Sequence, residues 1–160
     1  SGCLLYDVDG NEYIDYVLPY PGILPDHSLY PLKRLRDTLL LFFRRKPLEQ
    51  SSLLLLFADK YLVMGERLLE KGETDLAITT LTTGQGYLLS ALEALQPLAH
   101  AGTLPPGFLD KEALAVKKHL QELDRLQKNI KDDSVKQRII DVEKSTQQAT
   151  QLVLSLQGKN

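Results

Sequence analysis

Residues 19–37 read PYPGILPDHSLYPLKRLRD, and in this stretch a proline-rich extended segment passes into the first long helix. Its first three prolines fix their own φ and favour extended backbone at the residues before them. Asp26 or Ser28 can cap the helix, and Pro31 then lies in the first turn, where a missing N–H costs nothing. The stretch therefore separates an N-terminal part of β or extended character from a helical part.

The residues before this stretch alternate apolar and polar side chains on both sides of a turn. Asp9-Gly10-Asn11 lies between two such segments within residues 4–18, and this combination is a strong signal for a β-hairpin. We therefore predict an N-terminal β-hairpin or extended arm over residues 1–27, with the proline-rich segment as its connector.

The residues after the stretch have helical periodicity. Over residues 32–43 the apolar positions that are predicted to face the core share one side of a helix: Leu32, Leu35, Leu39, Phe42 and Phe43. Leu40 and Leu41 widen this side, so the helix is predicted to be buried on more than one side. Pro47 ends this segment and opens the next.

Two further helices follow, one from Pro47 to Gly72 and one from Thr74 to Pro97. The apolar stripe of the first is Leu54, Ala58, Tyr61, Gly65 and Leu68. The stripe of the second is Ala77, Leu81, Gly84, Leu88, Ala91 and Leu95. Small residues recur at every seventh position of the second stripe, which predicts a close approach by another helix along that line.

Residues 101–107 read AGTLPPG and form the clearest linker of the chain. The helix after it is predicted to bury Leu109, Ala113, Val116, Leu120, Leu123, Gln127 and Ile130. After a break over residues 129–134, the last helix is predicted to bury Val135, Ile139, Val142, Thr146, Ala149, Val153 and Leu156. These two helices are expected to form an antiparallel hairpin that packs on the bundle or projects from it.

Together these patterns predict an all-α fold with about five helices in an antiparallel bundle, preceded by the N-terminal hairpin or arm. The predicted organisation is an arm over residues 1–27, a three-helix core over 28–100 and a C-terminal helical hairpin over 101–160. With 160 residues, of which 43% are hydrophobic, the chain can bury a core as one domain without a metal or a disulfide.

Composition excludes several classes of protein. The net charge of −2 argues against a nucleic-acid-binding protein. The apolar run over residues 53–58 is far shorter than the roughly 20 residues that span a bilayer, so we expect no transmembrane segment. Cys3 has no cysteine partner; it follows Ser1-Gly2 as in a lipoprotein cleavage site, whereas Leu4 stands where a polar tether is usual. A lipidated cysteine and an unpaired thiol on an apolar strand both stay open.

Three segments carry a resemblance to a known family: PGILPDHSLYPLKRLRD at residues 21–37, ADKYL at 58–62 and EKGETDLA at 70–77. They resemble an uncharacterised family of exported bacterial helical domains with a Pro-Gly-x-Leu-Pro-Asp-x-x-Leu-Tyr-x-Leu-Lys segment. The likeness covers residues 17–96, and Ser28 stands where the family usually has proline. The resemblance implies an extracytoplasmic module, secreted or associated with the cell envelope, with no known activity.

Two local patterns in the arm point to ligands, and each fails on its context. Asp7, Asp9, Asn11 and Asp15 are spaced as ligands in an EF-hand-like calcium loop, but Glu12 replaces the required glycine and Leu18 the bidentate glutamate. Residues 6–15 are also similar to a hairpin of pyridoxal-phosphate aminotransferases, but the chain is too short for that fold. We therefore expect no cofactor and no metal site, and the calcium loop stays a weak candidate.

Catalytic residues do not stand out. His27, His100 and His119 are too scattered for a zinc site, and a surface or capping role is expected for each. We find no catalytic triad, no paired catalytic carboxylates and no phosphate-binding loop. The sequence thus indicates a protein that is not an enzyme.

The charges divide the N-terminal third into two parts. Residues 1–27 carry five acidic side chains and no Lys or Arg, whereas the first helix and its end are basic through Lys33, Arg34, Arg36, Arg44, Arg45 and Lys46. The arm can fold on its own helix, or it can lie on the basic helix of the next subunit in a head-to-tail assembly. A third interpretation is a peripheral contact of Arg44, Arg45 and Lys46 with anionic lipid.

These observations predict a non-enzymatic extracytoplasmic interaction or structural module that self-associates through its arm, as a homo-oligomeric ring or filament subunit. Other protein partners stay open. The predicted interaction residues are Leu5, Tyr6, Tyr13, Ile14, Tyr16, Arg34, Arg36, Arg44 and Arg45. The competing hypothesis is a small-ligand or metal-binding accessory protein of the cell envelope.

Overall fold

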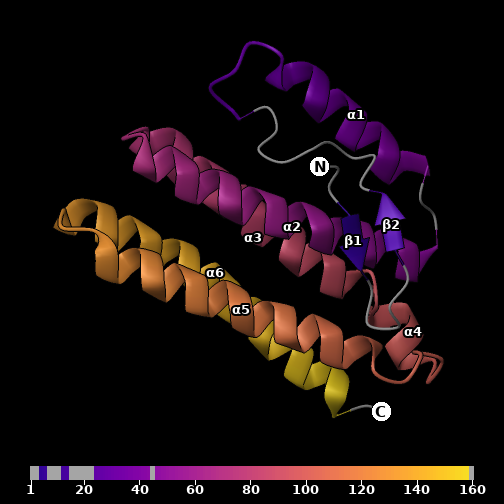
Figure 1. Ribbon diagram of the computed structural model, residues 1–160. Helices are drawn as coiled ribbons and strands as arrows, with labels where there is room; N and C mark the ends of the chain where they lie inside the picture. The colour runs from indigo at the N-terminus through magenta and orange to yellow at the C-terminus, as the bar shows by residue number, and fades with distance from the viewer. Residues whose placement is uncertain (1–3, 7–11, 15–23, 44–45, 159–160) are drawn as a thin grey trace.

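The computed structural model of the chain describes residues 4–6, 12–14, 24–43 and 46–158 (Figure 1). The elements in these ranges are β1 (Leu4–Tyr6), β2 (Glu12–Ile14), α1 (Tyr30–Phe43), α2 (Pro47–Glu70), α3 (Thr74–Glu93), α4 (Gln96–His100), α5 (Phe108–Asn129) and α6 (Asp133–Gln157). The predicted all-α class is confirmed: five long helices and the short α4 make up the described part of the chain after residue 24. No helix among the described residues is long and apolar enough to cross a membrane.

The hairpin of α2 and α3 turns sharply at Gly72, which has a positive φ of 81°. The N–H groups of Gly72 and Glu73 donate to the carbonyls of Leu69 and Leu68, so the turn satisfies the last carbonyls of α2. Helix α3 starts directly after this turn, at Thr74, and has Asp75 in its first turn. This geometry confirms the predicted break at Gly72.

The two helices of this hairpin approach closely at two glycines. A Cβ on Gly84 of α3 would lie 2.9 Å from Tyr61 Cβ, and one on Gly65 of α2 would lie 2.5 Å from Leu81 Cγ. The predicted stripes of α2 and α3 are buried in this contact, and Ala77 and Ala91 are fully buried. The predicted close approach along the small residues is therefore confirmed.

The second hairpin consists of α5 and α6. Asp132 caps α6, because its Oδ1 accepts hydrogen bonds from the N–H and hydroxyl of Ser134 at 2.8 and 2.6 Å. These bonds lower the pKa of Asp132. In Figure 1 this hairpin lies along α2 and α3, and it therefore packs back on the bundle.

The core lies between the two hairpins. One cluster joins Leu54 and Ala58 of α2 to Leu88 of α3, Val116 of α5 and Ala149 of α6. A second cluster farther along joins Leu62, Leu81, Leu123 and Ile139 and is likewise built from α2, α3, α5 and α6. Most positions in the predicted stripe of α6 are buried, as expected.

Helix α1 lies on the side of α2 that faces away from α5 and α6 (Figure 1). The prediction that Leu32 and Leu35 face the core is wrong, since both side chains are exposed and Lys33 and Asp37 are buried instead. The side chains of Leu39, Phe42 and Phe43 lie outside the described part of the structure.

The two short strands pair antiparallel, with Leu4 opposite Ile14, Leu5 opposite Tyr13 and Tyr6 opposite Glu12. The predicted turn at residues 9–11 and the connector at residues 19–23 lie outside the described residues. The N-terminal hairpin or arm over residues 1–27 therefore stays a prediction.

Candidate functional site: the outward face of helix α1

The turn before α1 ties this helix to α2. His27 Nδ1 accepts a hydrogen bond from the Leu29 N–H at 3.1 Å, and Asp26 forms an ion pair with Lys71 at 2.8 Å. The hydrogen bond from Lys71 lowers the pKa of Asp26. Asp26 thus anchors the start of α1 to the end of α2.

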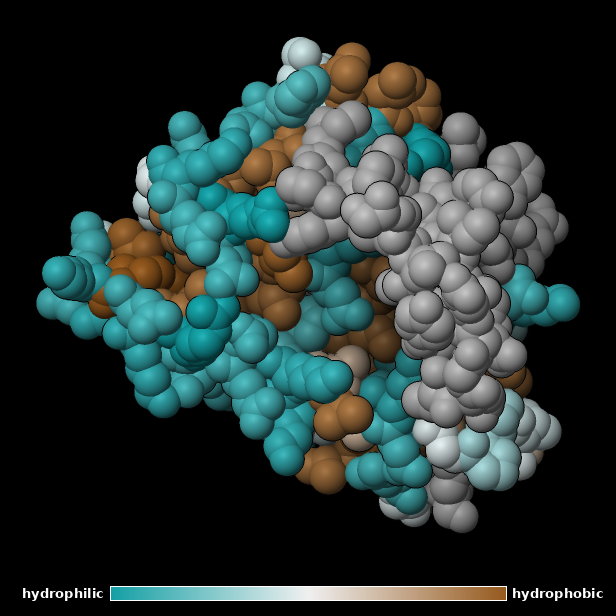
Figure 2. Space-filling model, in the orientation of Figure 1, coloured by the Kyte–Doolittle hydropathy of each residue, from teal (hydrophilic) through white to brown (hydrophobic). Residues whose placement is uncertain are grey.

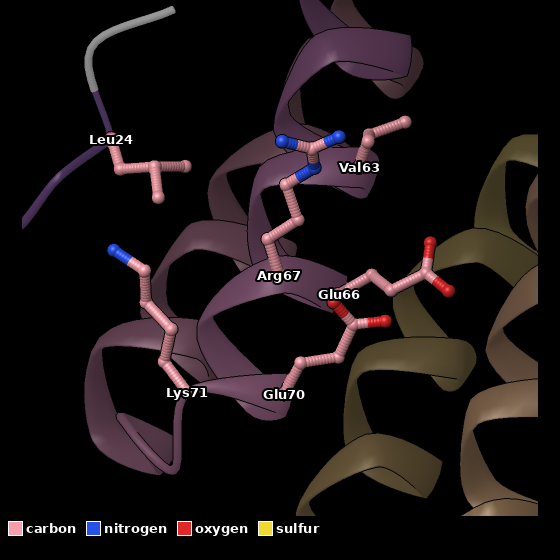
Figure 3. Close-up of a pocket in the computed structure, with 6 residues that line it drawn as sticks. All are labelled: Leu24, Val63, Glu66, Arg67, Glu70 and Lys71. Carbon is pink, nitrogen blue, oxygen red and sulfur yellow. The ribbon is translucent and has the colours of Figure 1, made fainter. Parts of the chain in front are cut away.

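A shallow hollow beside this anchor is lined by Leu24 and by Val63, Glu66, Arg67, Glu70 and Lys71 of α2 (Figure 3). Its two carboxylates balance its two cations. Figure 3 shows Lys71 pointing toward the segment of Leu24, while Glu66 points away from it and pairs with Arg125 of α5. The hollow therefore has no excess charge that would select a ligand.

The inner face of α1 meets α2 through polar and aromatic side chains. The Lys33 ammonium donates to Met64 Sδ at 3.1 Å and lies 5.6 Å from the ring centroids of Tyr30 and Tyr61. The hydroxyls of Tyr30 and Tyr61 share a hydrogen bond of 2.9 Å. Tyr61 in turn stacks edge-on against Tyr87 of α3, with ring centroids 5.2 Å apart.

Burial shifts the pKa values of the Lys33 and Tyr61 side chains in this contact. Loss of solvent lowers the pKa of Lys33, although the nearby Asp37 opposes the change. Loss of solvent also raises the pKa of Tyr61, and its hydrogen bond with Tyr30 raises it further. Asp37 is itself buried and receives hydrogen bonds from Arg36, the shorter at 2.5 Å. The inner face of α1 thus contacts α2 through the Lys33 ammonium, the hydrogen bond between Tyr30 and Tyr61, and the aromatic rings of these tyrosines.

Leucines are exposed at the start of α1 and in the turn just before it. Leu29, Leu32 and Leu35 follow at intervals of three and are 52%, 65% and 57% exposed. Figure 2 shows hydrophobic side chains reaching the surface at the top of the molecule, over the region where α1 begins in Figure 1. We call these three leucines the leucine row. An amphipathic helix normally turns its apolar side to the core, whereas Leu32 and Leu35 of α1 face solvent.

The predicted interaction residues divide among three places. Arg34 is exposed on α1, and Arg36 is bound to Asp37. By backbone position Leu5, Tyr6, Tyr13 and Ile14 lie in β1 and β2. The other predicted interaction residues lie outside the described residues: Tyr16, Arg44 and Arg45. So do the weak candidates for calcium ligands: Asp7, Asp9, Asn11 and Asp15.

Sequence reasoning missed a set of buried polar residues between the hairpins. His119 was expected at the surface but is 1% exposed; its ring nitrogens lie 3.1 Å from Gln85 Oε1 and 3.0 Å from Asp59 Oδ1. Glu112 is fully buried and accepts from Ser51. The signal was present: the buried line of α5 is spaced three and four apart through Leu109, Glu112, Val116, His119, Leu123 and Leu126.

Metal binding finds no support in these positions. Within the ranges that the structure describes, no group of three or more His, Cys, Asp and Glu side chains is placed to hold a metal ion. His27 is at the start of α1, His100 at the end of α4 and His119 in the core. Among the described residues, we therefore take the leucine row as the candidate interaction surface.

Comparison with known proteins gives one match. The model of a family described as a domain of unknown function, DUF5667, matches residues 22–133. No curated protein and no solved structure matches the chain. The matched region contains all of α1 and the α2–α3 hairpin that holds it, and it ends at the first residue of α6.

Proposed function

Because the chain belongs to this family of domains of unknown function, we propose its role from its own geometry: it is a non-enzymatic, extracytoplasmic interaction module that self-associates. In this proposal the leucine row of one copy receives the N-terminal arm, residues 1–27, of another copy. The extracytoplasmic location rests on the resemblance to exported bacterial domains. Fractionation of cells that produce the native protein would test it.

The leucine row carries the proposal. Leu32 and Leu35 of α1, and Leu29 in the turn just before it, are each more than half exposed, while the buried side of α1 contains a lysine and an aspartate. Covering them would contribute on the order of 1 kcal/mol for each side chain. A contiguous apolar surface of this kind is typical of an interaction site.

Charge selects the arm as the segment that covers the row. Two copies of α1 placed face to face would bring basic residues such as Arg34 close to one another. The arm carries five acidic residues and no Lys or Arg, and its alternating apolar residues can contact leucines. Each exposed ion pair adds only about 0 to 1 kcal/mol, so charge orients the contact and the apolar surface stabilises it.

A contact between two different surfaces of the same chain is heterologous. Such a contact closes into a ring or continues as a filament, depending on the rotation between subunits. The proposal therefore predicts assemblies larger than a dimer, which distinguishes it from a two-fold pairing of α1 helices.

Light scattering with paired variants tests the proposal. We expect the wild-type chain to assemble as its concentration rises, and the double variant Leu32→Glu with Leu35→Glu to stay monomeric and folded. Leu114→Glu on α5 is the matched control, because Leu114 is 52% exposed outside α1; it should assemble like the wild type. Deleting residues 1–18 should also leave a folded monomer.

Other results would contradict this role. A wild-type chain that stays monomeric up to roughly millimolar concentration, or a double variant that still assembles, would exclude the leucine row as the contact. Binding of the monomer to anionic vesicles, lost in the double variant, would indicate a lipid surface instead. A thermal shift on adding calcium or zinc to a monomer would favour the accessory-protein hypothesis.

A further inference from the structure

Glu112 is a carboxyl group enclosed by the two hairpins. It lies on α5 and is fully buried, and its Oε1 accepts a hydrogen bond from Ser51 Oγ of α2 at 3.0 Å. Its other oxygen, Oε2, is buried and has no hydrogen-bond partner among the described residues. An ionised carboxylate with one donor in such a place would lack most of the solvation it has in water.

Few groups near Glu112 could balance a negative charge. Ser51 and Asp59 of α2 act on it, the first by a hydrogen bond and the second by repulsion. On its own helix, the neighbouring Lys111 is exposed, and its charge opposes the rise in the pKa of Glu112; His119 lies two turns away. The buried polar residues of the other two helices, α3 and α6, include Gln85 and Thr146, which are neutral and bonded to each other at 3.0 Å.

The same face of α5 connects both hairpins. His119 contacts Asp59 of α2 and Gln85 of α3, and Gln85 contacts Thr146 of α6. The Ser51–Glu112 bond is therefore one of the polar contacts that join α2 to α5, and like that of His119 with Asp59 it involves a buried side chain of α5. Leu109 and Val116, one turn on either side of Glu112, pack in separate apolar clusters.

We propose that Glu112 is a proton-operated joint: its neutral form holds the α5–α6 hairpin against α2–α3, and loss of its proton to water loosens the bundle where Ser51 meets α5. The leucine row and the arm play no part in this device. Burial supports it, because it raises the pKa of Glu112 to about 7, while the bond from Ser51 opposes the rise.

The direction in which stability changes with pH follows from the difference between the folded and unfolded pKa of Glu112. The folded-state pKa lies above the ordinary value of 4.5 that the unfolded chain has, so the folded state holds the proton more tightly between these two pH values. The stabilisation is complete below about pH 4.5 and is lost as the pH rises through about 7. The folding equilibrium constant should fall on the order of 100-fold across this interval through Glu112.

Urea unfolding of the full chain from pH 5 to pH 9 tests the joint. Glu112→Gln keeps the shape without the charge and should remove most of this pH dependence. Glu93→Gln is the control, because Glu93 is exposed at the end of α3; it should behave like the wild type. Equal pH dependence in wild type and Glu112→Gln would overturn the proposal.

Two measurements locate the effect. Hydrogen exchange, corrected for intrinsic rates, should rise above pH 7 in residues 47–58 and 108–119 of the wild type and not in Glu112→Gln; a uniform rise over the bundle would overturn the joint. If Glu112→Gln does not fold, carboxyl-carbon NMR of the wild type decides. A Glu112 carboxyl that titrates near pH 7, and higher still in Ser51→Ala, supports the proposal, and one that titrates near its ordinary value refutes it.

Discussion

Helices α1 and α3 both pack on α2, but they bury opposite kinds of surface. Helix α3 presents an apolar stripe with Gly84 against Tyr61, close enough that a Cβ would not fit. Helix α1 presents Lys33 and Asp37 and turns its leucine row to solvent. The contact with α3 buries apolar side chains within one chain, whereas Leu32 and Leu35 of α1 stay exposed.

The largest expected difference comes from leucine truncation on the two surfaces. Leu54→Ala removes a buried side chain from the cluster between the hairpins and should lower the free energy of unfolding by about 2 to 5 kcal/mol. Leu32→Ala should change it by less than about 0.5 kcal/mol, because the side chain is exposed. Urea unfolding at concentrations where the chain is monomeric measures both. Similar losses would mean that the row is buried in the monomer.

A second pair of variants, Gly84→Ala and Gly86→Ala, tests how closely α2 and α3 approach each other. Gly84→Ala places a methyl group against Tyr61 and the Ala58 carbonyl, whereas a Cβ on Gly86, two residues along α3, meets nothing within 4 Å. Both changes gain the same helix propensity, so the difference between them isolates overpacking, about 1 to 3 kcal/mol. Thermal unfolding should rank Gly86→Ala above the wild type and Gly84→Ala below Gly86→Ala. Equal stability of the two variants would contradict the close approach.

The smallest expected effect concerns the contact of α1 with α2. Tyr61→Phe removes the hydrogen bond with Tyr30 and keeps the ring beside Lys33 and Tyr87. The loss should be about 0.5 to 1.5 kcal/mol and should fall on α1. Hydrogen exchange should therefore quicken in residues 30–37 and stay unchanged in α3. Faster exchange in α3 would show that the two contacts are coupled.

The bundle itself was predictable from the sequence. A helix that must bury one side repeats its apolar residues at intervals of three and four. The buried stripes of α2, α3 and α6 follow this rule, and they include Leu54, Leu88 and Ile139 respectively. Gly72 ends α2 because the turn needs a positive φ. These features depend on local geometry, so neighbours in the chain are sufficient to indicate them.

The polar interior was not predictable in the same way. Glu112 and His119 lie on the buried line of α5, but the partners that make their burial tolerable, Ser51, Asp59 and Gln85, are supplied by α2 and α3. Polar residues are ordinarily assigned to the surface because unpaired burial is costly. Only the packing of one hairpin on the other brings the partners within hydrogen-bond distance.

Helix α1 shows most clearly what the sequence alone does not predict. Its sequence determined that it is a helix with an apolar side, and also that it is basic. The tertiary structure decided that Leu32 and Leu35 face outward, because α1 packs on α2 through Lys33, which lies beside Tyr61 and Met64. Periodicity records which side of a helix is apolar, whereas the surface that covers that side depends on atoms elsewhere in the fold or in another molecule.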